Sequence, residues 1–190
     1  MDDEPAALRE AYGKCSVGEK ALLARRLVES GVTFVLVSGA WGYFDNHGDT
    51  VLPYLGIEKG LKLLLPGVDR TVHTLVTDLE QRGLLDTTLV IWGGEFGRTP
   101  YAEKNGTGRD HNPLGFTVWL AGGGFKAGFA HGETDDIGHM AVDGKVHMHD
   151  LHATILHQLG LDHEKLTFRQ GGRDFRLTDV HGHVVKEIVT

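Results

Sequence analysis

Two short runs of apolar and β-branched residues restrict the possible folds of this chain more than any other feature. One covers 32–37 (VTFVLV) and the other covers 87–92 (TTLVIW). A strand that is apolar on both faces is typical of a parallel sheet, because helices cover both of its sides. A helix predicted over 66–82, which begins at Pro66 and ends before Gly83, would connect the two runs as a crossover. The pattern therefore predicts an α/β fold with a mostly parallel sheet.

Further elements fit the same architecture. Two more stretches have helical spacing of their apolar residues, and each is followed by a glycine in the position that commonly ends a helix. These additional elements are the helices within 1–30 and 150–159, a third strand at 116–120, and hairpin strands at 175–180 and 184–188 within a C-terminal tail of 168–190. A chain of 190 residues has room for one domain, 1–190, which is either complete or part of a larger domain.

Composition excludes several classes of function. Lysine and arginine number 19 against 26 acidic residues, and this net charge of −7 argues against a nucleic-acid-binding protein. The single cysteine, Cys15, excludes an internal disulfide and a cysteine-cluster metal site. No apolar run approaches the length of a membrane span, and the acidic start MDDEP is not typical of a signal peptide. The 12 histidines favour a metal or acid–base function.

Metal-capable side chains follow two of the predicted strands. Asp45, His47 and Asp49 lie in the polar loop after the first strand, and Glu95 comes soon after the second. Ligands of open α/β sheets bind beyond the carboxyl ends of the strands, so these four residues are candidates for one site. His111 precedes the third strand, and it would reach the same edge only if that strand ran antiparallel to the others.

The residue types indicate which ligand such a site would bind. Mixed carboxylate and imidazole ligands suit a divalent metal, with zinc as the first expectation and manganese, iron, calcium or magnesium as alternatives. Arg98 and Arg109 lie in the same loops, and a guanidinium group matches a phosphate or sulfate group in geometry. We therefore expect a small-molecule or glycan ester with an oxyanion group as the substrate.

Each candidate also has a structural interpretation. The segment 45–49 has the composition of a turn, Glu95 could cap a helix or pair with Arg98, and Arg109 could pair with Asp110. Most other histidines lie in irregular polar stretches or on a helix surface and are expected to be exposed. These are His73, His131, His139, His147, His163, His181 and His183, while His149, His152 and His157 are closer to a functional interpretation.

Several motifs together resemble one bacterial family. They are FDNHGD at 44–49, GEFGRTP at 94–100, GRDHNP at 108–113, LAGGGFKAG at 120–128, DLHATILHQLGL at 150–161 and the closing segment 172–188. In this order they are similar to the C-terminal half of the family named domain of unknown function 1501. That family is a sulfatase-like branch of the alkaline phosphatase superfamily.

The resemblance implies a sulfatase-like sandwich with a mostly parallel sheet and metal ligands at the strand ends. By position, Asp45, His47 and His111 would hold one metal, with Asp49 as an alternative ligand. The Asp-His pair of the second metal corresponds to Glu95 and Phe96, and this replacement of histidine argues against a complete two-metal site.

The resemblance also implies that the superfamily's nucleophile and first strands are absent from this chain. We therefore expect a partial domain of a metal-dependent hydrolase for phosphate or sulfate esters that is inactive alone. The alternative is a non-catalytic, metal-stabilised binding or scaffold module of the bacterial cell surface. The family suggests an exported or periplasmic location, which the chain itself leaves open. The very apolar strand 32–37 predicts self-association through an uncovered sheet edge.

Overall fold

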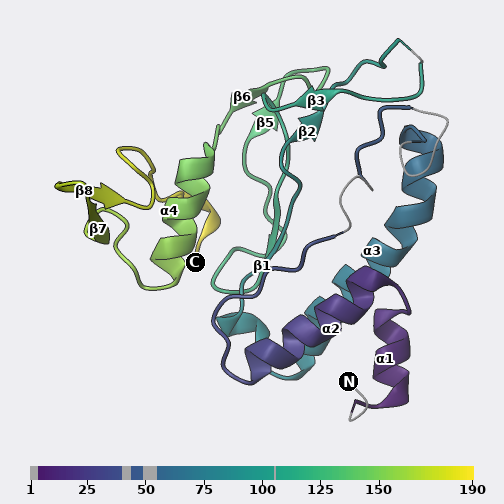
Figure 1. Ribbon diagram of the computed structural model, residues 1–190, viewed down its shortest axis with the longest axis horizontal. Coiled ribbons are helices and arrows are strands. Elements are labelled where there is room, and N and C mark those ends of the chain that lie inside the picture. Colours follow the sequence, from purple (N-terminus) through teal and green to yellow (C-terminus); the bar gives the residue numbers. More distant parts are fainter. Residues whose placement is uncertain (1–3, 40–43, 49–54, 105) are drawn as a thin grey trace.

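The N-terminal part of the chain is helical. The computed structural model describes residues 4–39, 44–48, 55–104 and 106–190. Three helices pack together: α1 (Ala6–Tyr12) and α2 (Ser16–Glu29), at one end of the molecule, contact the long helix α3 (Ile57–Gln81), which extends toward the other end (Figure 1). The sequence predicts the end of α3 well but not its start, because the helix continues through Pro66. Gly31 and Gly83 follow α2 and α3 with positive φ, as expected for glycines that end helices.

A buried polar network joins the three helices. Tyr12 at the end of α1 is fully buried and donates a hydrogen bond of 3.0 Å to Asp78 of α3. Arg25 of α2 is 1% exposed, and its guanidinium lies 2.8 Å from Asp78, 2.8 Å from Glu4 and 2.6 Å from Glu29. Burial and the neighbouring carboxylate of Asp78 raise the pKa of Tyr12. Charged groups buried at this depth need partners, so the network fixes how the helices meet.

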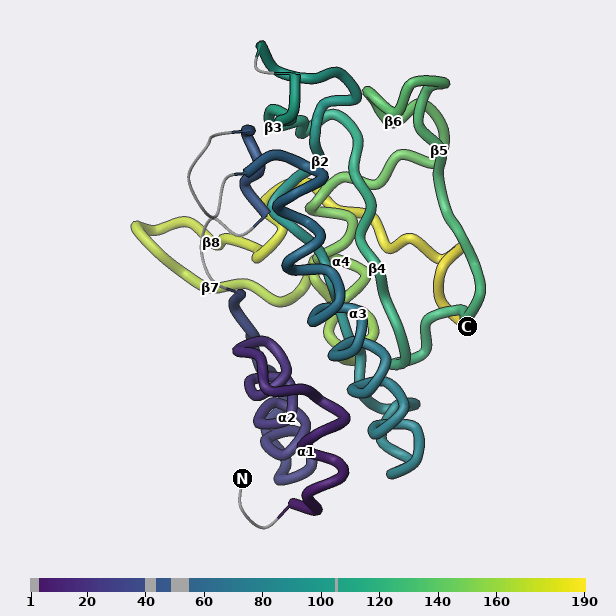
Figure 2. Tube along the Cα trace, turned by 90° about the vertical axis from the view of Figure 1, so that its right-hand side faces the viewer, coloured from purple at the N-terminus to yellow at the C-terminus, as the bar shows by residue number. Residues whose placement is uncertain are grey.

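The strands are short and pair antiparallel. The described residues form four two-stranded sheets. These pairs are β1 (Val90–Trp92) with β4 (Trp119–Ala121), β2 (Gly97–Arg98) with β3 (His111–Asn112), β5 (Glu133–Thr134) with β6 (Ala141–Asp143), and β7 (Thr167–Gln170) with β8 (Arg173–Arg176). Figure 2 shows β2, β3, β5 and β6 at the end of the molecule opposite α1 and α2.

The expected sulfatase-like sandwich with a mostly parallel sheet is therefore wrong for this structure. The predicted strand 87–92 is present only as β1, because 85–87 form a short 3-10 helix. Its partner β4 follows it along the chain and returns antiparallel, with Ile91 opposite Leu120. An apolar run indicates that a strand must be covered on both faces, but it does not specify whether the neighbouring strand is parallel or antiparallel.

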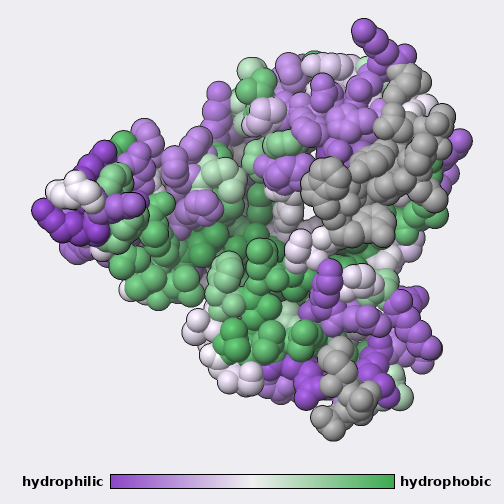
Figure 3. Space-filling view, in the orientation of Figure 1, coloured by the Kyte–Doolittle hydropathy of each residue, from purple (hydrophilic) through white to green (hydrophobic). Residues whose placement is uncertain are grey.

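The predicted strand 32–37 has no strand partner in the described part of the chain. The segment lies outside helices and strands, and Phe34 and Leu36 are 77% and 80% exposed. Figure 3, in the orientation of Figure 1, shows a broad hydrophobic area on the face of the molecule that is turned to the viewer. The β-branched composition favours an extended backbone, but pairing also requires a neighbouring strand, which none of the described segments supplies.

The C-terminal part consists of α4 (Met148–Gln158), the β7–β8 hairpin and a short 3-10 helix at Lys186–Ile188. The hairpin therefore lies earlier than the strands predicted at 175–180 and 184–188. His163, expected to be exposed, is buried and lies 3.0 Å from the Thr178 hydroxyl. Among the helices of the described residues, none combines the length and apolar character needed to cross a membrane.

Candidate metal centre

Two hairpin strands and one loop segment converge to form the site. β2 and β3 pair so that Arg98 lies opposite His111. The backbone N–H of Arg109 donates a 3.1 Å hydrogen bond to the carbonyl of Asn46. This bond places the segment 44–48 against the start of β3, and it brings Asp45 and His47 next to His111.

Small residues allow this close approach. A Cβ on Gly108 would lie 1.8 Å from the carbonyl oxygen of His47, and a Cβ on Gly60 would lie 1.8 Å from Oδ1 of Asn46. Asn46 itself is 1% exposed. The segment that carries Asp45 and His47 thus lies between α3 and the start of β3. A side chain at position 108 would displace its backbone, and one at position 60 would displace the side chain of Asn46.

Three potential ligand atoms lie close to one another. Nε2 of His47 is 2.8 Å from Oδ1 of Asp45, Nε2 of His111 is 3.0 Å from the same oxygen, and the two nitrogens are 3.1 Å apart. Atoms that bind one zinc ion at about 2.0–2.2 Å lie roughly 3.0–3.5 Å from one another. The spacing of these three atoms is therefore close to that of a shared metal ion, and the residues fit such an ion.

Glu103 supports His47 from the other side of the imidazole ring. Its Oε1 lies 2.5 Å from Nδ1 of His47. This hydrogen bond, with the nearby Asp45 charge, raises the pKa of His47 against the opposing effect of partial burial. A carboxylate on the second ring nitrogen is the usual partner of a metal-binding histidine, since it fixes the tautomer. His47, Glu103 and Asp110 also form a second group with mutually close ligand atoms.

Sequence reasoning missed Glu103. It lies in a polar loop between β2 and β3, with no strand register or helical spacing to relate it to His47. The one available signal was its position between two segments that both carry candidate ligands.

Arg98 links the ligand set to Glu95. Its Nη1 donates a 3.1 Å hydrogen bond to Oδ1 of Asp45, and its Nη2 lies 3.6 Å from Oε1 of Glu95. Burial of Asp45 opposes ionisation, but the hydrogen bonds from His111 and Arg98 outweigh it and lower the pKa of Asp45. The carboxylate is therefore held in the ionised form that a metal ion requires.

The other candidates have different positions. Among the described residues, Glu95 does not join the close group of ligand atoms; its side chain is 62% exposed and pairs with Arg98. The guanidinium of Arg109 donates to the carbonyl of its neighbour Gly108, so its contribution to the site is its backbone N–H. Phe96 packs against the ring of His111, with centroids 4.5 Å apart. Asp49 lies outside the described residues.

The sequence required the strand after His111 to run antiparallel if His111 was to lie near Asp45 and His47, and this arrangement is observed. β4, which comprises the end of the predicted strand 116–120, runs antiparallel to β1, and His111 lies beside Asp45 and His47. The hairpin of β2 and β3 lies in the connection between these two strands. Because that connection folds back on itself, residues before β4 reach the same place as residues after β1.

Comparison with known proteins identifies a family but no activity. The model of a family described as "Protein of unknown function (DUF1501)" matches residues 1–189. No curated protein matches the chain, and neither does any protein of solved structure.

Proposed function

Because the chain belongs to the DUF1501 family, whose description assigns no activity, we propose its function from the geometry of the site. The proposal is a metal-dependent, hydrolase-like domain that binds a phosphate or sulfate ester next to one divalent cation. Asp45, His47 and His111 would hold the cation, and Glu103 would orient His47.

The close approach of Oδ1 of Asp45 to two imidazole nitrogens carries the proposal. Surface ion pairs commonly join two groups, whereas here three metal-capable atoms are mutually within 2.8–3.1 Å. One carboxylate and two imidazoles suit zinc, and also manganese or iron, so zinc is the first metal to test.

We assign oxyanion binding to Arg98. Its side chain is partly exposed, and Nη1 and Nη2 each have one carboxylate neighbour. A guanidinium group has five N–H donors, so donors remain for phosphate or sulfate oxygens after Asp45 and Glu95 are satisfied. When bound, a divalent cation supplies a Lewis acid that polarises an oxygen of the same group.

A non-catalytic, metal-stabilised binding module is the second candidate. One observation favours it: Phe96, at the position where the resemblance implies a histidine of the second metal, packs against His111. In such a module the metal would fix the segment 44–48 to β3, and an ester would bind without turnover.

Metal analysis tests the site. The chain, purified without a histidine tag, is titrated with zinc against a chromophoric chelator, together with the D45A/H111A variant. We expect the variant to lose one zinc equivalent and the increase in melting temperature that zinc causes. The matched control is H73A, because His73 is an exposed histidine on α3, away from the site. Unchanged zinc stoichiometry in D45A/H111A would refute the assignment of ligands.

Oxyanion binding separates the two candidates. With zinc bound, we expect inorganic phosphate and sulfate to bind by calorimetry, and the R98A variant to weaken this binding at least tenfold. Hydrolysis of 4-nitrophenyl phosphate or sulfate that disappears in D45A/H111A would favour the hydrolase. Anion binding that depends on Arg98 without any turnover would favour the module. Zinc binding with no affinity for either anion would refute the role of Arg98.

A further inference from the structure

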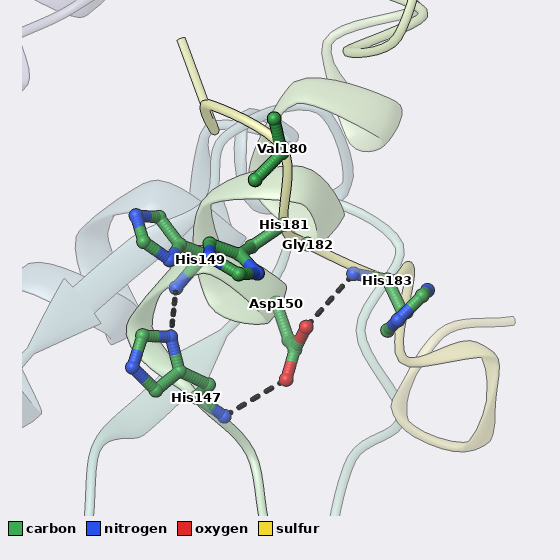
Figure 4. Close-up of a pocket in the computed structure, with 7 residues that line it drawn as sticks. All are labelled: His147, His149, Asp150, Val180, His181, Gly182 and His183. Atoms are coloured by element: carbon green, nitrogen blue, oxygen red, sulfur yellow. Dashed lines mark hydrogen bonds between the residues drawn. The ribbon is translucent and has the colours of Figure 1, made fainter. Parts of the chain in front are cut away.

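A second group of histidines gathers around a hollow at the N-terminal end of α4. Four histidines and Asp150 line this hollow, which has a volume of about 520 Å³ (Figure 4). They come from two separate His-x-His pairs, His147 with His149 and His181 with His183. We propose that His147, His149 and His181 bind a second transition-metal ion, independently of the site at Asp45.

Asp150 holds the two segments together. One of its carboxylate oxygens accepts a 2.9 Å hydrogen bond from the backbone N–H of His147, and the other accepts one of 2.8 Å from the N–H of His183. Gly182 has a φ of +95°, and a Cβ there would lie 2.9 Å from the carbonyl of His149. The backbone of both His-x-His pairs is thus fixed before any ligand binds.

Two of the three ring spacings suit a shared ion. The ring centroids of His147 and His149 are 4.8 Å apart, and those of His149 and His181 are 5.4 Å apart. Two imidazoles that bind one zinc ion at about 2.0 Å have centroids about 5 Å apart. His183 points away from the other three rings, so it is left out of the ligand set (Figure 4).

The central ring has unused hydrogen-bonding capacity. Nδ1 of His149 is buried and has no hydrogen-bond partner among the described residues. A buried polar atom without a partner is uncommon and costs free energy. Because no hydrogen bond fixes the tautomer of His149, either nitrogen can carry the proton while the other binds a metal.

The rings are stacked or tilted, so their nitrogens do not yet converge on one point. His147 and His181 are both exposed, so their side chains have room to rotate, and the proposal requires a rotation that directs their nitrogens inward. This rotation breaks the 3.2 Å hydrogen bond from the N–H of His149 to Nδ1 of His147. That bond is one half of the capping box at the start of α4, so metal binding has to offset its loss.

The ligand set also determines which metal it selects. Each oxygen of Asp150 accepts a hydrogen bond from a backbone N–H group, so this carboxylate holds the backbone in place and the ligands that we propose are imidazoles alone. Imidazole suits zinc, copper and nickel, whereas magnesium and calcium require oxygen ligands. Metal binding here would crosslink α4 to the segment 181–183, and this differs from the mixed carboxylate–imidazole set at Asp45.

Zinc stoichiometry in four chains tests the proposal: wild type, D45A/H111A, H149A/H181A and the combined variant. We expect two, one, one and no zinc equivalents, respectively. Loss of binding in D45A/H111A concerns the function proposed above, whereas loss in H149A/H181A concerns this site, so either can fail alone. A hundredfold excess of calcium or magnesium is expected to leave the zinc bound by D45A/H111A in place.

The matched control is H152A/H157A, which removes two exposed histidines from the same helix. We expect it to retain both equivalents. Because His181 is exposed, H181A alone is expected to keep the fold and to weaken the second equivalent at least tenfold. In spectra of the imidazole nitrogens, zinc should shift the signals of His149 and His181. A second equivalent that survives H149A/H181A, or is lost equally in the control, would overturn the proposal.

Discussion

Replacing Gly108 by alanine should destroy the metal centre without removing any ligand. The added Cβ would lie 1.8 Å from the carbonyl oxygen of His47, 2.0 Å from its carbonyl carbon and 2.6 Å from the N atom of Gly48. Favourable contacts between non-bonded heavy atoms begin at about 3.5 Å. All three neighbours are backbone atoms, so the clash cannot be relieved by a side-chain rotation, and the segment must move by more than about 1 Å.

Such a movement affects affinity and stability together. Metal–ligand distances tolerate only about 0.2 Å, so displacing His47 while His111 stays on β3 should weaken zinc binding at least about 100-fold. The shift also stretches the 3.1 Å hydrogen bond from the N–H of Arg109 to the carbonyl of Asn46. Losing that bond and repacking Asn46 should cost about 1–3 kcal/mol of unfolding free energy.

Two measurements check this prediction: zinc affinity by chelator competition, and the free energy of unfolding in urea without metal. The control is G39A, because a Cβ on Gly39 meets no atom of the described residues within 4 Å and Gly39 is not among the glycines with positive φ. G39A should match wild type in zinc affinity. If G108A bound zinc within threefold of wild type, the close approach of 44–48 to β3 would be incorrect, and with it the geometry of the site.

Three further predictions concern residues that support the site and the fold. E103Q should weaken zinc binding about 10–100-fold at unchanged stability, because it weakens the hydrogen bond that orients His47; equal affinities by chelator competition would contradict this. D78A should lower the unfolding free energy in urea by about 3–5 kcal/mol, since Arg25 and Tyr12 lose a buried partner, whereas D69A at an exposed position of α3 should change it by less than about 0.5 kcal/mol. Although burial opposes it, hydrogen bonds from two backbone N–H groups lower the pKa of Asp150 below its ordinary value of 3.8. Its contribution to stability is therefore present above about pH 4 and lost as the pH falls through the lowered value. D150N should reduce this loss in acid unfolding curves recorded without metal, and identical curves would contradict the role of the carboxylate.

Helix ends could be predicted from the sequence because they depend on local chemistry. Gly31, Gly83 and Gly160 follow α2, α3 and α4 with positive φ, and the chain at each of these positions adopts the expected cap. The start of α3 could not be predicted in the same way. Pro66 is favourable in a first turn, but α3 begins at Ile57 and continues through it.

Sheet topology could not be predicted, because strand pairing depends on distant residues. The runs 32–37 and 87–92 have similar apolar character, yet part of one pairs with β4 and the other has no partner in the described part of the chain. Phe34 and Leu36 are exposed although apolar side chains favour burial, and no described segment covers them. Self-association through this segment remains a prediction.

The histidines of α4 illustrate the limit of reasoning within one element. His152 and His157 share a helix but point to different faces, and spacing alone gave no reason to relate His149 to His181. The relation depends on Asp150, whose two oxygens reach backbone N–H groups on both segments. A carboxylate that caps a helix can also fix a distant loop, and only the three-dimensional structure shows this second contact.

The sequence led to two expectations that conflict at His111: a mostly parallel sheet, and a site shared with Asp45 and His47. A mostly parallel sheet would have placed the residues before the third strand at the opposite edge from Asp45 and His47. A shared site required that strand to be antiparallel, and β4 is antiparallel to β1. The antiparallel direction of β4 agrees with the expectation from the candidate site and not with the expectation from the apolar runs, because a shared metal site would constrain both distance and direction. Burial constrains neither, so a run of valines and leucines fits a parallel or an antiparallel neighbour equally well.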